Sequence, residues 1–404
     1  MSETILSQDP ESKTEILTNL VKDVFDIDHL MLGTSQDTFY VQYFGSLIRP
    51  SEDAFDYLQK NLISHDLTPI LRFDKGKHTL ILRKGLISAN PTNPRINLIL
   101  FFITFISVLF SGMLNSYTGP PTADLGIIWA HVRLNLGESL GFAFSMLGIL
   151  TAHEFGHYFA ARYHNTRVTL PYFIPFPLSP FGTMGAFIRM QEPPKNKKVL
   201  LDIGLAGPLA GLIVAIPVLV IGLYLSPMEV LPASLPEGFI FEGNSILYLA
   251  MKYIIHGSLL PEPSSYSGLP AVIHWIRYFF TGLPLPAGGV DVMIHPVAWA
   301  GWAGLLITSL NLLPAGQLDG GHLIYSLFGD KLRWIRPVIL VMLVLLGFLW
   351  SGWWLWAFMI LVLGKRRAEP LDEITDLDPG RKTLARIGLV IFFLIFMPVP
   401  LISI

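Results

Sequence analysis

Long apolar stretches constrain the fold of this chain more than any other feature of its sequence. A helix needs about 20 predominantly apolar residues to cross the hydrocarbon core of a bilayer. Only 14% of the 404 residues are charged, against roughly 25% in a typical soluble protein. The sequence therefore predicts an α-helical polytopic membrane protein, with spans expected at 97–114, 138–163, 202–225, 296–313 and 388–404.

The apolar run between Arg336 and Lys365 has two interpretations. One tilted helix could just accommodate it, but it is interrupted by Gly347, Ser351 and Gly352. A single crossing would also place the basic residues at its two ends on opposite sides of the membrane. Because basic residues near span ends favour the cytosolic side, we predict two short helices that turn near Ser351–Gly352.

Residues 1–95 have a different composition and predict a small α+β domain of order αβαββ. Apolar spacing is helical at 14–25 and 51–62 and strand-like at 38–44, 69–73 and 78–83. Arg83, Lys84 and Arg95 precede the first span, so the positive-inside tendency places this domain and the N-terminus in the cytosol. The membrane domain is expected over 96–404, with its core motifs within 140–330.

Two segments of the membrane domain are too broken by Pro and Gly to cross a bilayer. Residues 168–190 are expected to form a hairpin that dips into the membrane from the cytosolic side. Residues 226–295 resemble a long outer loop, in which the apolar pieces 246–255 and 273–280 are too short to span alone. We expect these two pieces to lie along the outer surface or to dip into it.

The net charge and the lack of cysteine exclude several kinds of partner and site. A net charge of −2 leaves no basic stripe for a phosphate backbone, so nucleic acid is not an expected partner. The chain contains no cysteine, which excludes disulfides, thiolate metal sites and cysteine nucleophiles. Any metal must therefore be held by nitrogen and oxygen.

The sequence His153-Glu154-Phe155-Gly156-His157 fits the pattern H-E-x-x-H. Histidines four residues apart project from one helix face and can share one zinc ion, while the glutamate between them can take a proton from water. The alternative is a pair of buried histidines with Glu154 in an ion pair. Ionisable groups inside a span are costly without a partner or a water-filled cavity, and their clustering here favours a site.

A catalytic zinc site usually has three protein ligands and one open position. The remaining candidates are few. One is Asp319, which follows the span 296–313 and precedes two glycines; a helix N-cap is its alternative role. His322 competes as a ligand or as a partner of one. Asn311 could donate hydrogen bonds to a polarised carbonyl oxygen, or could bond a neighbouring helix.

These motifs resemble the site-2 protease family of intramembrane zinc metalloproteases. The resemblance rests on H-E-F-G-H at 153–157 together with N-L-L-P at 311–314 and L-D-G-G at 318–321, and it covers roughly 140–330. It implies that His153, His157 and Asp319 bind zinc and that Glu154 is the catalytic glutamate. The segment Gly182–Gly185 also resembles the family's G-x-x-G strand, which implies pairing with an extended substrate, although a glycine-rich turn would look the same.

The resemblance implies a protease whose partners are the lipid bilayer and membrane proteins with transmembrane segments. No PDZ module is recognisable between the third and fourth spans. The chain most resembles bacterial members with a small N-terminal cytosolic domain, which implies a bacterial cytoplasmic membrane. Two alternatives stay open: a metal or proton transporter that uses the same His/Asp cluster, and a catalytically silent scaffold that keeps the metal for stability.

Overall fold

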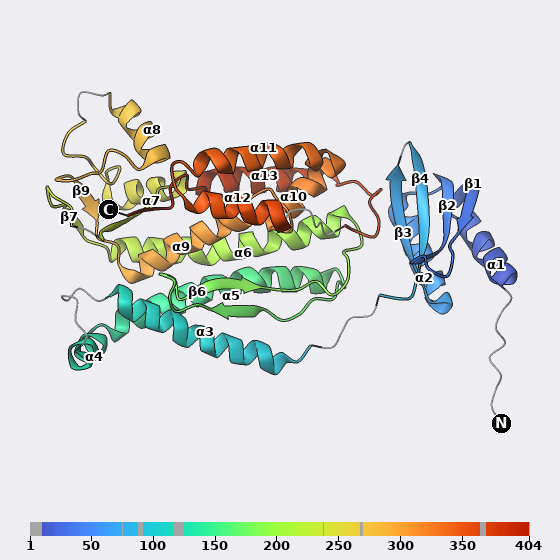
Figure 1. Cartoon of the computed structure of the whole chain (residues 1–404), viewed down its shortest axis with the longest axis horizontal. Helices are drawn as coiled ribbons and strands as arrows, with labels where there is room; N and C mark the ends of the chain where they lie inside the picture. The colour runs from blue at the N-terminus through green and yellow to red at the C-terminus, as the bar shows by residue number, and fades with distance from the viewer. Residues whose placement is uncertain are drawn as a thin grey trace. The chain divides into compact units, whose positions relative to one another are not determined.

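The structure is a computed structural model that describes residues 10–74, 76–87, 92–116, 124–236, 238–266, 270–363 and 369–403. The chain forms two compact units, shown in Figure 1. The smaller unit comprises residues up to 90 together with 191–200 and 368–379, and the larger unit comprises the remainder. Each unit is described by itself.

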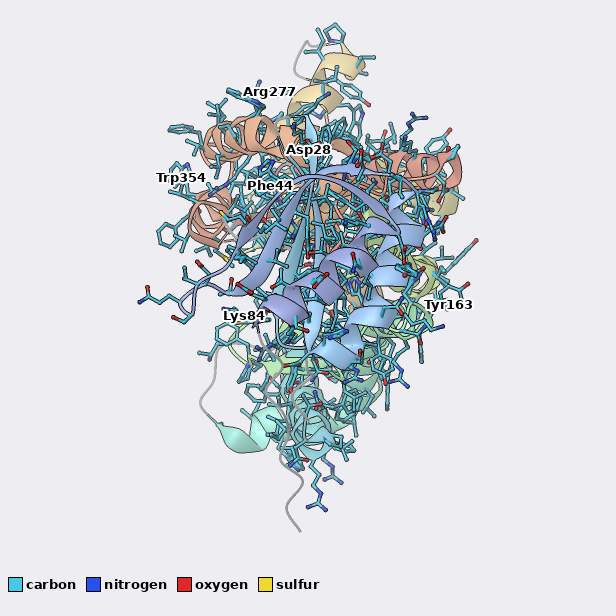
Figure 2. All side chains as sticks on the ribbon, turned by 90° about the vertical axis from the view of Figure 1, so that its right-hand side faces the viewer. Asp28, Phe44, Lys84, Tyr163, Arg277 and Trp354 are labelled. Carbon is cyan, nitrogen blue, oxygen red and sulfur yellow. The ribbon has the colours of Figure 1, made fainter. Side chains whose placement is uncertain are left out.

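The smaller unit is a four-stranded antiparallel sheet packed against two helices. Its elements are α1 (Pro10–Lys22), β1 (Phe25–Leu32), β2 (Phe39–Leu47), α2 (Ser51–Leu62), the short 3-10 turn η1 (Ile63–His65), β3 (Leu67–Asp74) and β4 (Lys77–Lys84), and the strand order is β1-β2-β4-β3. Leu17 of α1 and Phe55 of α2 are fully buried against Tyr43 and Leu80 of the sheet. Figure 2 faces this unit and labels Asp28, Phe44 and Lys84 on three of its strands.

The expected order αβαββ is wrong because it lacks β1, and the observed order is αββαββ. The sequence of β1, FDIDHLML, places Asp26, Asp28 and His29 among its apolar residues. This edge strand is mostly exposed beyond Phe25, and its register shifts between Ile27 and His29. An exposed strand with a bulge has no regular alternation of buried apolar residues, so the pattern that identifies strands is absent.

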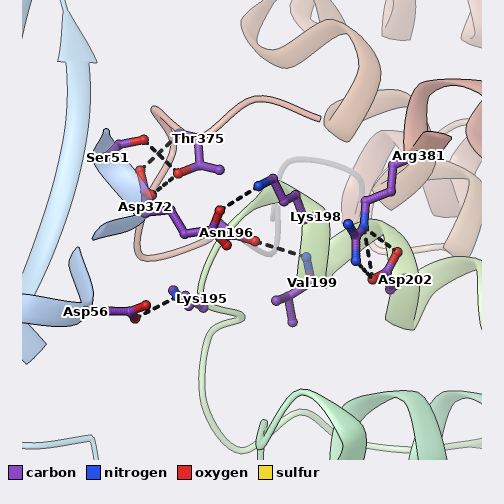
Figure 3. Close-up of polar contacts among 11 residues, drawn as sticks. Ser51, Asp56, Lys195, Asn196, Lys198, Val199, Asp202, Asp372, Thr375 and Arg381 are labelled. Atoms are coloured by element: carbon purple, nitrogen blue, oxygen red, sulfur yellow. Dashed lines mark hydrogen bonds and ion pairs between the residues drawn. The ribbon is translucent and has the colours of Figure 1, made fainter. Parts of the chain in front are cut away.

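A distant segment completes the small sheet at its β3 edge. The backbone N–H of Leu71 donates to the carbonyl of Leu371 at 2.8 Å, and that of Glu373 donates back to Leu71 at 3.2 Å. Leu371 is buried in the core of the domain. The carboxylate of Asp372 accepts hydrogen bonds from Thr375, whose hydroxyl also lies 2.7 Å from that of Ser51 (Figure 3). The compact unit therefore includes a segment that lies far beyond residue 95 in the chain.

Residues 191–200 join the same unit through charged contacts with α2. Lys195 pairs with Asp56 at 2.6 Å (Figure 3). Lys198 pairs with Glu52 at 2.5 Å. These carboxylates follow one face of the helix, at positions i and i+4. The smaller unit thus includes two segments from later in the chain, 191–200 and 368–379.

The larger unit is mainly helical. Its helices are α3 (Pro94–Asn115), α4 (Leu125–Leu134), α5 (Leu136–Tyr163), α6 (Lys197–Tyr224, which enters this unit at Leu201), α7 (Ile246–His256), α8 (Ala271–Thr281), α9 (Pro296–Asn311), α10 (Asp319–Phe328), the short 3-10 turn η2 (Gly329–Lys331), α11 (Leu332–Leu346), α12 (Gly352–Leu363) and α13 (Pro379–Ile395). In Figure 1 the long helices α3, α5 and α6 run side by side. By length and composition, α3 and α6 could each cross a membrane, and shorter apolar helices cover 246–256, 334–346 and 352–362.

A carboxylate clamp ties three helices of this unit together. The carboxylate of Asp202 on α6 accepts hydrogen bonds from Nε and Nη2 of Arg381 on α13, the second at 2.6 Å (Figure 3). Nε2 of His164, at the end of α5, lies 2.9 Å from the same carboxylate. Bidentate pairing fixes direction as well as distance, so the clamp sets the rotation of α6 at its second turn.

The run between Arg336 and Lys365 forms the predicted hairpin. Helix α11 ends at Leu346, α12 begins at Gly352, and the two helices pack against each other. Nη2 of Arg336 donates to the carbonyls of Ile360 and Leu361 at 3.2 and 2.9 Å. A cation at the C-terminal end of a helix satisfies free carbonyls and complements the helix dipole.

The last predicted span is wrong in its bounds. Helix α13 starts at Pro379 and ends at Ile395, and residues 401–403 form strand β10, which pairs with β8 (Ile240–Glu242). Pro398 and Pro400 lack the N–H groups that a helix needs, so they end it before the C-terminus. Because residues 388–404 are mostly apolar throughout, their composition does not distinguish the helix from the strand that follows it.

The segment 226–295 contains more regular structure than a loop. Strands β7 (Met228–Val230) and β9 (Val290–Val292) pair with each other, and α7 and α8 occupy the two predicted apolar pieces. Lys252 of α7 is fully buried, with Nζ 3.7 Å from Oε1 of Glu242. Asp291 is also buried. One buried cation thus faces two buried carboxylates, which leaves an excess negative charge when all three are ionised.

This charge imbalance predicts that acid stabilises the segment 226–295. Burial raises the pKa of Glu242 to about 7 despite Lys252, and it also raises the pKa of Asp291. Because the folded pKa of Glu242 lies above its ordinary value of 4.5, its stabilising contribution is complete below that value and is lost as pH rises through about 7. We expect hydrogen-exchange protection of 240–256, corrected for intrinsic rates, to fall with rising pH across this range.

The matched control for this prediction is Glu242→Gln, which keeps an acceptor for the hydroxyl of Tyr248, 2.9 Å away. In this variant the protection of the same peptides should vary much less with pH. An equally steep loss of protection in both proteins would contradict the assignment to Glu242.

Candidate metal centre

Three side chains from two helices converge in the larger unit. His153 and His157 lie four residues apart on α5, and Asp319 is the first residue of α10. Nε2 of His153 is 3.2 Å from Nε2 of His157, and Oδ2 of Asp319 is 3.3 Å from each of them. The histidines are buried and the aspartate side chain is 15% exposed.

The spacing of these atoms fits a tetrahedral metal ion. Zinc lies about 2.0–2.2 Å from nitrogen and oxygen ligands, so neighbouring ligands at a tetrahedral centre are about 3.3 Å apart. The three observed separations are 3.2, 3.3 and 3.3 Å. No other group of three such ligands lies this close together in the described part of the chain. Three ligands leave a fourth position for water or substrate.

The alternatives for Asp319 and His322 can be compared with this geometry. The residue before helix α10 is Leu318, and Asp319, the first residue of the helix, directs its carboxylate at the histidines. His322, one turn further along, is buried against Gly204 of α6, and it lies outside the three-ligand group. The cap interpretation therefore does not describe Asp319.

Glu154 is buried beside the two histidines, with 4% of its surface exposed. The backbone of Ile188, just after strand β6 (Thr183–Phe187), lies near its carboxylate. Glu154 is thus placed next to the metal centre while remaining outside the ligand group.

Asn311 reaches the same centre from the last turn of α9. Its Nδ2 lies 3.2 Å from Nε2 of His153. This contact joins α9 to α5, as the alternative of a bond to a neighbouring helix expects, and it also places the amide beside the ligand cluster. An amide here can donate to an oxygen atom bound at the centre.

Strands β5 (Tyr172–Pro175) and β6 form the hairpin expected within 168–190. Polar side chains of α3 hold it: Ser107 donates to the carbonyl of Gly182 at 2.6 Å, and Ser111 donates to that of Ser179 at 2.9 Å. Asn97 and Asn115 bond further carbonyls of the same segment. Sequence reasoning missed these residues, although polar side chains within an apolar helix were a visible signal.

The two glycines of the hairpin have different surroundings. A Cβ on Gly182 would lie 2.4 Å from Cα of Val108, and its N–H and carbonyl already bond Ser179 and Phe176. Gly182 therefore serves packing against α3, and its role in close approach of substrate stays a prediction. Gly185 has a φ of +103° and no other atoms near its Cβ position. It remains a candidate for substrate contact.

Comparison with known proteins adds a family and several relatives. The model of "Peptidase family M50" matches residues 141–350. "Probable zinc metalloprotease EGY1, chloroplastic" of Arabidopsis thaliana is 27% identical over 396 residues, covering 89% of this chain and 66% of that protein. "Probable zinc metalloprotease EGY2, chloroplastic" of Oryza sativa subsp. indica is 28% identical over 259 residues, covering 62% and 41%.

"Probable zinc metallopeptidase EGY3, chloroplastic" of Arabidopsis thaliana is 26% identical over 258 residues, covering 62% of this chain and 41% of the relative. The chain thus spans between about two fifths and two thirds of the length of these relatives. Their names place the relatives in chloroplasts, so the likeness to bacterial members and a bacterial membrane stays a prediction.

Proposed function

The chain belongs to peptidase family M50, and from this premise we propose that it is a zinc metalloprotease of membrane protein substrates. It would hydrolyse peptide bonds in or near transmembrane segments. The observation that carries the proposal is the tetrahedral spacing of His153, His157 and Asp319 within a largely apolar helical unit. The family match favours hydrolysis over transport by the same cluster.

In the proposed mechanism His153, His157 and Asp319 hold the ion. Zinc supplies Lewis acidity, which polarises the scissile carbonyl and makes water a better nucleophile. Glu154 takes the proton from the attacking water and later returns it to the leaving amine, so no proton is lost or gained over the cycle. The Asn311 amide donates to the carbonyl oxygen as negative charge develops there.

Strand β6 is the proposed docking edge for substrate. A peptide bond in a helix is shielded, so a transmembrane substrate must unwind before cleavage, and its exposed backbone groups must then be paired. Among the described residues, β6 pairs with β5 on one side only, and the backbone of Ile188, which follows it, lies near the carboxylate of Glu154. A substrate strand added to this edge would lead to the catalytic carboxylate.

Proline at Met184 is expected to impair substrate capture without affecting the metal. Met184 is 69% exposed on β6, and proline removes its backbone N–H. Cleavage should fall at least about tenfold, as expected for loss of a paired backbone group in a low-dielectric groove, while zinc content stays at the wild-type level. Met184→Ala is the matched control. Equal cleavage by the proline and alanine variants would contradict substrate pairing and leave this segment as a simple glycine-rich turn.

We further propose that the small domain, and with it the N-terminus, faces the cytosol. Basic residues before α3 favour this orientation. The hydrogen bonds between Leu71 and the segment 371–373 support placement of both linker and domain on one side of the membrane.

The orientation can be tested with single cysteines, because the chain has none of its own. We expect a membrane-impermeant maleimide to label Asp53→Cys and Glu369→Cys only from the cytosolic side, and Ser264→Cys only from the opposite side. All three positions are exposed. Labelling of Asp53→Cys and Glu369→Cys from opposite sides would exclude a membrane-spanning α11–α12 hairpin.

The proposed substrate class can be tested by mapping new protein termini in membranes that contain either the wild-type protein or Glu154→Gln. The proposal predicts termini within or beside transmembrane segments that arise only with the wild type. Termini confined to soluble regions would overturn the intramembrane assignment. Metal flux that is equal in both proteins, with no new termini, would favour the transporter.

A further inference from the structure

Helix α6 lies directly against the rings of both metal-site histidines. Nδ1 of His157 is 2.7 Å from the backbone carbonyl oxygen of Ile203, and both atoms are buried. A carbonyl oxygen can only accept a hydrogen bond, so Nδ1 must carry the proton. Nε2 then keeps its lone pair, and this is the atom that faces His153 and Asp319. The contact therefore selects the ring tautomer that can bind a metal through Nε2.

Glycine makes this close contact possible. A Cβ on Gly207, one turn after Ile203, would lie 2.0 Å from Nε2 of His157. One turn further, a Cβ on Gly211 would lie 3.2 Å from Nδ1 of His153, a tight contact that a small shift could relieve. The face 203–211 of α6 thus has no room for a side chain where it contacts the ring of His157. Where it contacts the ring of His153, a methyl group would need only a small shift.

The carboxylate clamp holds this face in place. Asp202 immediately precedes Ile203 and is fixed by Arg381 and His164. His164 lies two helical turns after His157 on the same face of α5. Helices α5 and α6 are therefore joined at two levels, one through His164 and one through the Ile203 carbonyl.

We propose that the face 203–211 of α6 positions the metal ligands, with Gly207 as the positioning residue for His157. The inference rests on the proposed function, since it assigns these residues to the same zinc site. The carbonyl and Gly207 act together: the first fixes the tautomer and orientation of the ring, and the second leaves the space that the ring and the ion require. Groups that orient a ligand in this way commonly contribute 10- to 100-fold to metal affinity.

The test is the zinc affinity of the purified full chain, measured by competition with a chelator. Gly207→Ala should bind zinc about 10- to 100-fold more weakly than the wild type, and Gly211→Ala should lose less. Gly148→Ala is the matched control, because it makes the same substitution in α5 where no atom lies within 4 Å of the Cβ position. Thermal unfolding of the metal-free proteins separates a loss of ligand geometry from a loss of fold.

A second measurement does not depend on the folding of any glycine variant. Nitrogen-15 magnetic resonance of histidine-labelled wild-type protein with zinc should show Nδ1 protonated and Nε2 bound to metal at His157, assigned by the signal lost in His157→Gln. Metal on Nδ1, or wild-type zinc affinity in a folded Gly207→Ala, would overturn the inference and leave the proposed function standing. A wild-type protein that binds no zinc would overturn both.

Discussion

Replacing Glu154 with glutamine is expected to abolish most peptide hydrolysis while zinc remains bound. Glutamine matches glutamate in size, so the buried position next to His153 and His157 stays filled, but its amide cannot take a proton from water. A positioned general base contributes about 100- to 10,000-fold to rate. We therefore expect the cleavage of a transmembrane substrate in proteoliposomes to fall by that factor.

Zinc content, measured by plasma mass spectrometry on the same samples, is the control for this variant. It should stay close to one ion per chain, because Glu154 lies outside the three-ligand group. Residual cleavage above a tenth of the wild-type rate would exclude Glu154 as the general base. A simultaneous loss of zinc would instead move Glu154 into the ligand set.

Replacing Asp319 with alanine is expected to remove the metal and the activity together. Oδ2 of Asp319 is the oxygen that completes the site, 3.3 Å from each histidine nitrogen. Two ligands on one helix remain after the substitution, which is too few for the three-ligand arrangement of catalytic zinc. We expect zinc affinity to fall by more than the 10- to 100-fold that loss of an outer partner causes.

His322→Ala is the comparison for this prediction, since His322 lies one turn from Asp319 and packs on α6. Its zinc content should remain near that of the wild type. Full zinc occupancy in Asp319→Ala would place the third ligand elsewhere, and the double variant with His322→Ala would then identify whether His322 supplies it.

The sequence predicted those parts of the molecule that have a short-range pattern. The spacing of His153 and His157 encodes a shared helix face, and interruptions at Gly347 and Ser351 marked the α11–α12 hairpin. Asp319 is a candidate ligand because it directly follows the predicted span 296–313 and precedes two glycines, and the family resemblance implies the same role. In each case the physical cause, helix periodicity or the cost of buried charge, acts within a few residues or depends on residue type alone.

Other features depend on partners that no local pattern reveals. The carbonyl of Ile203 is a backbone group, which every residue type provides, so the sequence contains no sign that His157 bonds it. Strand β1 is an exposed edge and lacks alternation. The span predicted over 388–404 relied on apolar composition. It did not take into account that Pro398 lacks the N–H that a continuing helix needs, and α13 ends at Ile395.

The closure of the small sheet by Leu371 has a consequence for the order of biosynthesis. Arg72, beside the β3 edge, and Leu371 are separated by 299 residues, and a ribosome adds about 5–20 residues per second. The β3 edge must wait roughly 15–60 s for this segment, during which the region of the candidate metal centre and the α11–α12 hairpin are translated. An unpaired edge is a site of aggregation. Only a chain translated past the hairpin can cover this edge in the observed way, so a prematurely terminated chain would leave the edge of β3 unpaired.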